Sequence, residues 1–134
     1  MNPDGEQASG AGRALPPALH AANEGLAFLL ELIMLAGLAW WGSQTVSGVA
    51  GRLTLAIAVP ALAVIIWGLF AAPRARFQLP VVGVHAVKAI VFGGVTSAVF
   101  SIGHHTLAIA FAVVAAANAT VAAIDRDALA RRGG

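Results

Sequence analysis

The sequence predicts an all-α fold, a bundle of four helices that cross a lipid bilayer. Hydrophobic residues make up 59% of the 134 residues and charged residues only 10%, whereas a soluble domain carries about 25% charged residues. The apolar residues form four stretches of roughly 19–21 residues, and a helix of that length spans about 30 Å, the thickness of the hydrocarbon core. These stretches also lack the polar face that a helix in a water-soluble bundle requires.

The chain begins with a polar segment, and the first apolar helix follows it. Residues 1–17 are rich in Gly, Ala and polar side chains without a hydrophobic period, so we expect a disordered tail. Pro16 and Pro17 suit the first turn of a helix, where the missing N–H is not needed. The first membrane helix is expected at residues 21–41, and Gly42 with the polar residues after it ends it.

Three further helices follow after short connections. The second is expected at residues 53–72, ended by Pro73 and two arginines. The third is expected at residues 81–100, with Pro80 just before its first turn. The fourth is expected at residues 106–124.

We therefore take residues 18–125 as one membrane domain and residues 126–134 as a basic C-terminal tail. The composition excludes a water-soluble globular enzyme, because the chain has too few polar residues to cover a solvated surface. The absence of cysteine excludes a disulfide scaffold and an iron–sulfur site. The eight Lys and Arg residues are scattered, so we expect a lipid bilayer and no nucleic acid as the partner.

The distribution of arginine predicts the orientation of the helices. With four spans, the N-terminus, the loop between the second and third helices, and the C-terminus lie on one side. Basic residues gather in cytoplasmic loops of membrane proteins, so we expect a multi-pass protein of the plasma membrane with both termini in the cytoplasm. The side with the termini carries Arg13, Arg74, Arg76, Arg126, Arg131 and Arg132, against Arg52 alone on the other.

Six polar residues occur inside the expected helices, where a charged side chain costs about 2.5–3.5 kcal/mol. From the helical rise we place all six in the half of the membrane nearer the termini, about 5–15 Å deep. Glu24 and Glu31 are seven residues apart and share a helix face. The six candidate site residues are Asn23, Glu24, Glu31, His85, Lys88 and Asn118.

Three interpretations of this polar cluster remain open. Glu31 or Glu24 can pair with Lys88 in a structural ion pair that fixes the helix register. The same residues can form a site for an ion, a proton or a small ligand, open to the cytoplasm. Alternatively, Glu24 and His85 reach the membrane interface along their apolar stems.

No residue set predicts catalysis, a metal or a cofactor. His104 and His105 lie in the outer loop, but two histidines alone are too few ligands for a metal site. About 28 Å of helix separates them from His85. The chain has no Gly-x-Ser-x-Gly motif and no glycine-rich phosphate loop, so we expect no enzymatic activity.

Small residues recur at intervals of four along the third and fourth helices. This spacing favours close helix approach in membranes. We expect Gly93 and Gly94 to permit such packing, and the fourth helix to pack within the bundle or against a second copy in a homodimer. The recurring sets are Gly93 and Ser97; Ala112, Ala116 and Thr120; and Ala115, Ala119 and Ala123.

Four runs in this order resemble the YrdB family of small bacterial membrane proteins: NEGLAFLLEL at 23–32, WGLFAAPRAR at 67–76, LP at 79–80 and VFG at 91–93. The resemblance covers residues 21–125 and implies four membrane helices with no assigned activity. It makes Glu31, Pro73 and Arg74 the family-type residues. The family often carries an acid in the third helix where this chain has Lys88, which argues against a cation site made of two acids.

Two functions follow from these observations. The first is a small, non-enzymatic, multi-pass membrane protein of unassigned role with a polar cluster in the cytoplasmic half of the bundle. The alternative is a minimal dimeric transporter of small cations or drugs that uses the acid in the first helix. Small multidrug-resistance exporters have that acid too, but this chain has no tyrosine and lacks their fuller motif.

Overall fold

The computed structural model describes residues 14–72 and 74–133. These residues form helices only, and no strand occurs among them. All four helices are long and apolar enough to cross a membrane, which confirms the all-α fold of four candidate membrane helices. The helices are α1 (Pro17–Thr45), α2 (Val49–Phe70), α3 (Val81–Ser101) and α4 (His105–Arg132).

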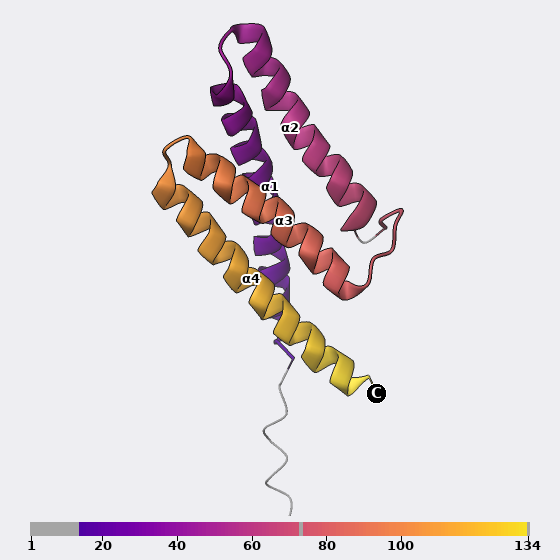
Figure 1. The fold of residues 1–134 in the computed structure, drawn as a ribbon. Coiled ribbons are helices and arrows are strands. Elements are labelled where there is room, and N and C mark those ends of the chain that lie inside the picture. The colour runs from indigo at the N-terminus through magenta and orange to yellow at the C-terminus, as the bar shows by residue number, and fades with distance from the viewer. Residues whose placement is uncertain (1–13, 73, 134) are drawn as a thin grey trace, which may run out of the picture.

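The helices form two hairpins, α1–α2 and α3–α4, whose turns lie at the same end of the molecule (Figure 1). We call this the hairpin end, and the end with the start of α1, the α2–α3 connection and the end of α4 the terminal end. Helices α1 and α3 each contact the other three helices, whereas α2 and α4 do not touch within the described residues. Helices α1 and α3 are therefore the central pair.

Glycine makes both hairpin turns possible. Gly48 and Gly103 each have a φ of 90°, a backbone conformation that a side chain disfavours. No non-glycine residue of the described chain has a positive φ. The two short turns fix α1 against α2 and α3 against α4.

Helices α1 and α4 extend beyond the apolar stretches that predicted them, and α2 runs from Val49 to Phe70 where residues 53–72 were expected. Helix α1 starts at Pro17 and ends at Thr45, not at 21 and 41. Helix α4 continues to Arg132, so most of the expected tail at 126–134 is helical, because Ala, Leu and Arg favour a helix whether or not lipid surrounds it. Of the expected disordered tail at 1–17, residues 1–13 lie outside the described residues.

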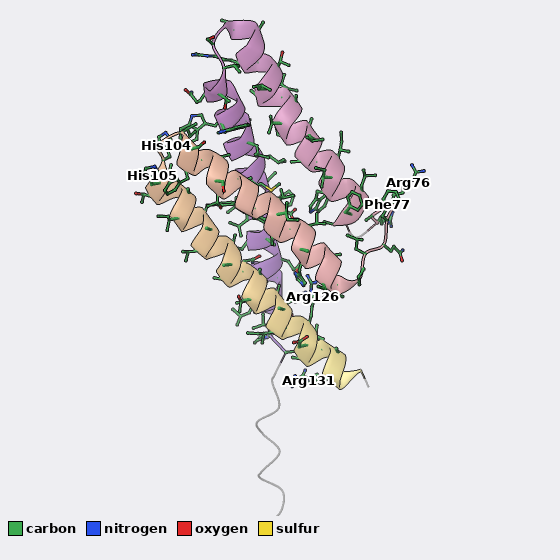
Figure 2. The ribbon with its side chains drawn as sticks, viewed as in Figure 1. Arg76, Phe77, His104, His105, Arg126 and Arg131 are labelled. Atoms are coloured by element: carbon green, nitrogen blue, oxygen red, sulfur yellow. The ribbon has the colours of Figure 1, made fainter. Side chains whose placement is uncertain are left out.

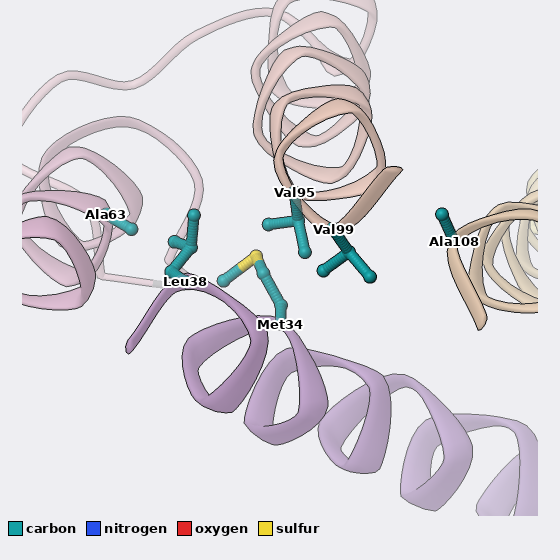
Figure 3. Packing of buried hydrophobic residues seen from close by; sticks show 6 residues of the cluster. All are labelled: Met34, Leu38, Ala63, Val95, Val99 and Ala108. Atoms are coloured by element: carbon teal, nitrogen blue, oxygen red, sulfur yellow. The ribbon is translucent and has the colours of Figure 1, made fainter. Parts of the chain in front are cut away.

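The apolar core lies where α1, α2 and α3 meet, nearer the hairpin end, and the start of α4 closes it (Figure 3). Gly42 brings α1 directly onto α2, because a Cβ at this position would lie 2.6 Å from the backbone oxygen of Leu55. Many large apolar side chains outside the core are exposed, among them Val82 at 79% and Ile90 at 74%. Such an apolar exterior suits a lipid environment. The core residues are Met34, Leu38, Ala63, Val95, Val99 and Ala108.

Candidate functional site

The polar residues that the sequence singled out lie together around one cavity. The cavity has a volume of about 650 Å³ and lies between α1, α3 and α4, toward the terminal end. Its size falls within the range of small-molecule binding sites, about 300–1,000 Å³. Several of its lining residues are exposed, so the cavity opens to the outside of the bundle. Helix α1 contributes Asn23, Glu24 and Glu31, helix α3 contributes His85 and Lys88, and helix α4 contributes Asn118.

Glu31 and Lys88 form the ion pair that the sequence suggested. The Lys88 Nζ lies 3.7 Å from the Glu31 Oε1, and the side chains are 30% and 21% exposed. At that distance the contact is an ion pair without a short hydrogen bond. Both side chains also line the cavity, so the pair contacts the space that a ligand would occupy.

Asn118 joins α4 to α1. Its Nδ2 donates hydrogen bonds to the backbone oxygen of Asn23 at 2.9 Å and to the Asn23 Oδ1 at 2.8 Å. Asn118 is 9% exposed, and both amide hydrogens are used by these two bonds. Asn118 therefore holds one wall of the cavity in place.

Arg126 belongs to the site although the sequence placed it in the tail. It lines the cavity, and its Nη1 lies 3.5 Å from the His85 Nε2. Figure 2 shows Arg126 on α4, toward the terminal end. Asn118, Ala122 and Arg126 are spaced by four, so continuing the helical pattern beyond Ile124 would have found it.

A second polar contact that the sequence missed fastens the start of α1 to α4. The Leu15 N–H donates to the Asp125 Oδ1 at 2.7 Å, and the His20 Nδ1 lies 2.6 Å from the Asp125 Oδ2. Asp125 follows Ile124, the last residue of the apolar stretch, and is 4% exposed. These two contacts join the start of α1 to α4 at the terminal end.

The charges of the cavity are separated by sign. The acids, Glu24 and Glu31, lie on α1, whereas the basic or titratable nitrogens of His85, Lys88 and Arg126 lie on α3 and α4. Among residues 14–72 and 74–133, no cationic nitrogen lies within 4.0 Å of the Glu24 carboxylate. The two sides meet at the ion pair between Glu31 and Lys88. Within the described chain, Glu24 on α1 and Arg126 on α4 are therefore the charged side chains that a ligand meets outside that pair.

Small side chains leave the rest of the cavity open. Within the described chain, nothing lies within 4 Å of a Cβ built on Gly93 or Gly94. The expectation that these glycines permit close packing is therefore wrong within this chain, because α3 presents Gly93 to the cavity. Five alanines of α4 also line it: Ala112, Ala115, Ala116, Ala119 and Ala122.

His104 and His105 lie at the hairpin end, away from the cavity (Figure 2). His104 packs against Trp40 in a tilted arrangement with ring centroids 4.2 Å apart, and His105 stacks on Phe100 at 4.0 Å. The part of the chain that the structure describes has no group of three or more His, Cys, Asp or Glu side chains placed to hold a metal ion. The two histidines are thus held by aromatic contacts at the α3–α4 turn.

Arg74, a family-type residue in the α2–α3 connection, does not reach the cavity. Arg74 is exposed and does not line the cavity, and Pro73 lies outside the described residues. Glu31 is the family-type residue that the structure places in the site.

The comparisons with known proteins identify a family of unknown function, as the resemblance implied, and do not confirm the YrdB name. A family model described as "Protein of unknown function (DUF2568)" matches residues 25–116, which include α3 and most of the cavity. No curated protein and no solved structure gives a significant match. Because the matched region makes up more than half of the sequence, the chain belongs to the DUF2568 family.

Proposed function

We propose that this small multi-pass membrane protein binds a small charged ligand in its cavity and has no enzymatic activity. One observation supports this proposal above the others: residues from three helices, far apart in sequence, converge on one space of about 650 Å³. The ion pair between Glu31 and Lys88 does not close that space. A purely structural pair needs no such cavity beside it.

The proposed location is the plasma membrane of a bacterium, with both termini and the mouth of the cavity in the cytoplasm. The arginines of the terminal end support this orientation, since basic residues favour the cytoplasmic side. Figure 2 shows Arg76, Arg126 and Arg131 toward that end. The motifs at residues 23–32 and 67–76 support placing the chain in the YrdB group.

A dimeric transporter is the second candidate. The exposed Ala116, Ala119 and Ala123 of α4 would allow a second copy to approach closely. A dimer would then enclose the cavity and place Glu31 on a pathway. The ion pair at Glu31 favours a binding site over transport, because an acid that releases its cargo must first be freed from Lys88.

Two neighbouring glycines provide a matched test of the binding proposal. A side chain at Gly93 or at Gly94 meets no atom of the described chain within 4 Å, but only Gly93 lines the cavity. We expect Gly93→Phe to fill the cavity and Gly94→Phe to leave it open. The wild type and both variants are purified in a mild detergent, and native mass spectrometry measures the small molecules that stay bound.

The proposal expects a bound small molecule in the wild type and in Gly94→Phe and its loss from Gly93→Phe, with similar melting temperatures for the two variants. Equal occupancy in Gly93→Phe and Gly94→Phe would show that the cavity is not the binding site.

A further inference from the structure

A second cavity lies beside the polar one. It has a volume of about 410 Å³ and belongs to the same three helices, α1, α3 and α4, nearer the hairpin end. Its lining is apolar apart from Thr96 and the indole nitrogen of Trp40, and it includes Ile33, Val99 and Leu107. We call it the apolar chamber, and the cavity described above the polar chamber.

The two chambers meet at Thr96, which lines both. The Thr96 hydroxyl donates to the backbone oxygen of Phe92 at 2.9 Å, so it is satisfied within α3. Phe92 lines the polar chamber and Phe111 the apolar one, and their ring centroids lie 5.5 Å apart. This aromatic pair therefore lies at the boundary between the two chambers.

We propose that the ligand is an amphiphile of the lipid phase, with a zwitterionic headgroup in the polar chamber and one hydrocarbon chain in the apolar chamber. This inference rests on the proposed binding function and names the class of ligand. The two chambers reproduce the division of such a molecule, charged at one end and apolar at the other. The polar chamber also lies at the end where the lipid headgroups of one leaflet are expected.

The separation of charge selects a zwitterion over a single ion. The anion of the headgroup faces Arg126 and Lys88, and the cation faces Glu24 and Glu31. Glu31 and Lys88 already pair with each other. A headgroup with one charge therefore leaves either Glu24 or Arg126 without a counter-charge among the described residues. Glu24 has no cation within 4.0 Å in the described chain. The cation of the ligand would be its counter-charge.

The hydrocarbon chain of the ligand enters the apolar chamber from the side of the bundle that faces the lipid. Ile33 and Leu107 of the apolar chamber are 46% and 56% exposed, so the chamber is open toward the surrounding lipid. Transfer of a chain from lipid into an apolar chamber has no large hydrophobic driving force. Affinity must therefore come from the headgroup, and the apolar chamber selects the ligand by shape.

Trp40 makes occupancy of the apolar chamber measurable, because it lines that chamber. The chain has three tryptophans. The substitutions Trp41→Phe and Trp67→Phe leave Trp40 as the single tryptophan whose fluorescence is measured. The protein is studied in nonionic maltoside micelles. The probe is a lysophosphatidylethanolamine with a brominated chain, which quenches tryptophan on contact.

Two threonines provide the matched variants. Thr96 and Thr120 each donate to the backbone oxygen four residues earlier, but Thr120 lines neither chamber. We expect saturable quenching of Trp40, weakened about tenfold in apparent affinity by Thr96→Phe and unchanged by Thr120→Phe. A brominated fatty acid and a brominated alkylammonium should each bind about tenfold more weakly than the zwitterion.

Glycerophosphoethanolamine, the headgroup without a chain, separates the two proposals in isothermal titration calorimetry. If glycerophosphoethanolamine binds but the lysolipid gives no saturable quenching, the proposal that a hydrocarbon chain occupies the apolar chamber is overturned. The proposed function then still stands. Equal quenching in Thr96→Phe and Thr120→Phe also overturns the proposal about the hydrocarbon chain. If neither glycerophosphoethanolamine nor the lysolipid binds, the proposed function is overturned as well. The same holds if the protein is a dimer that binds neither compound because a second copy fills the two chambers.

Discussion

The two halves of the bundle are held together differently. At the hairpin end, α1 lies directly on α2 at Gly42, and Met34, Val95 and Val99 pack in the apolar core between α1, α2 and α3. The apolar chamber lies beside this core, between α1, α3 and α4. At the terminal end, α1, α3 and α4 surround the polar chamber, and an ion pair and amide hydrogen bonds join them. In lipid, small residues let helices approach closely, and polar side chains join helices by hydrogen bonds. The contact between α1 and α2 is therefore close, whereas α1, α3 and α4 leave space between them.

The largest effect is expected where the two hairpin helices touch. In Gly42→Ala, the new Cβ would lie 2.6 Å from the Leu55 backbone oxygen, so α1 and α2 must separate, at a cost of about 1–3 kcal/mol. The measurement is the melting temperature in detergent. Gly68→Ala is the control because its Cβ meets nothing within 4 Å, and an equal loss in the two variants would contradict the close approach.

Removing the amide that joins α4 to α1 should come next. Asn118→Ala loses both hydrogen bonds to Asn23, worth about 0.6–2 kcal/mol each in a membrane protein. A lower melting temperature together with faster hydrogen exchange near the end of α4 is expected. Thr120→Ala loses only a hydrogen bond within its own helix and should change neither the melting temperature nor the hydrogen exchange. A comparable change in Thr120→Ala would show that the bonds between α4 and α1 have no special effect.

A smaller effect is expected at the ion pair, because both side chains are partly exposed. Glu31→Gln and Lys88→Met should each lower the unfolding free energy by about 1 kcal/mol or less. The double variant should lose less than the sum of the two single variants, since neither charge is then left without its partner. Strictly additive losses, measured by denaturant titration, would indicate that the pair contributes nothing to stability.

The smallest effect should come from Asp125, at the end of the bundle. Its carboxylate accepts a hydrogen bond from the Leu15 N–H and lies 2.6 Å from the His20 Nδ1. Asp125→Asn keeps one oxygen acceptor and replaces the other with an amide NH₂, so one of the two contacts is weakened and the melting temperature should fall slightly. An equal melting temperature in Asp125→Asn and in the wild type would show that the Asp125 carboxylate is not needed for the docking of Leu15 and His20.

The candidate site was largely predictable because its residues conflict with their surroundings. Charged groups within apolar stretches are costly, so Glu31 and Lys88 stand out from composition alone, and helical spacing places Glu24 on the same face as Glu31. Arg126 was missed because the end of an apolar stretch was taken as the end of a helix, although α4 continues. His20 and Asp125 carry no signal of their own, because they lie 105 residues apart and meet only in the folded chain.

By itself the sequence determined the four apolar helices and the polar character of the terminal half, whereas the structure decided that Glu31, and not Glu24, pairs with Lys88. Length, hydropathy and charge act locally along the chain, so these properties can be read without coordinates. The tertiary structure decided that Gly93 and the alanines of α4 line a space and do not close it. It also decided that two chambers meet at Thr96. Small residues permit close packing and open space equally, and only the angles and separations between helices determine which of the two occurs.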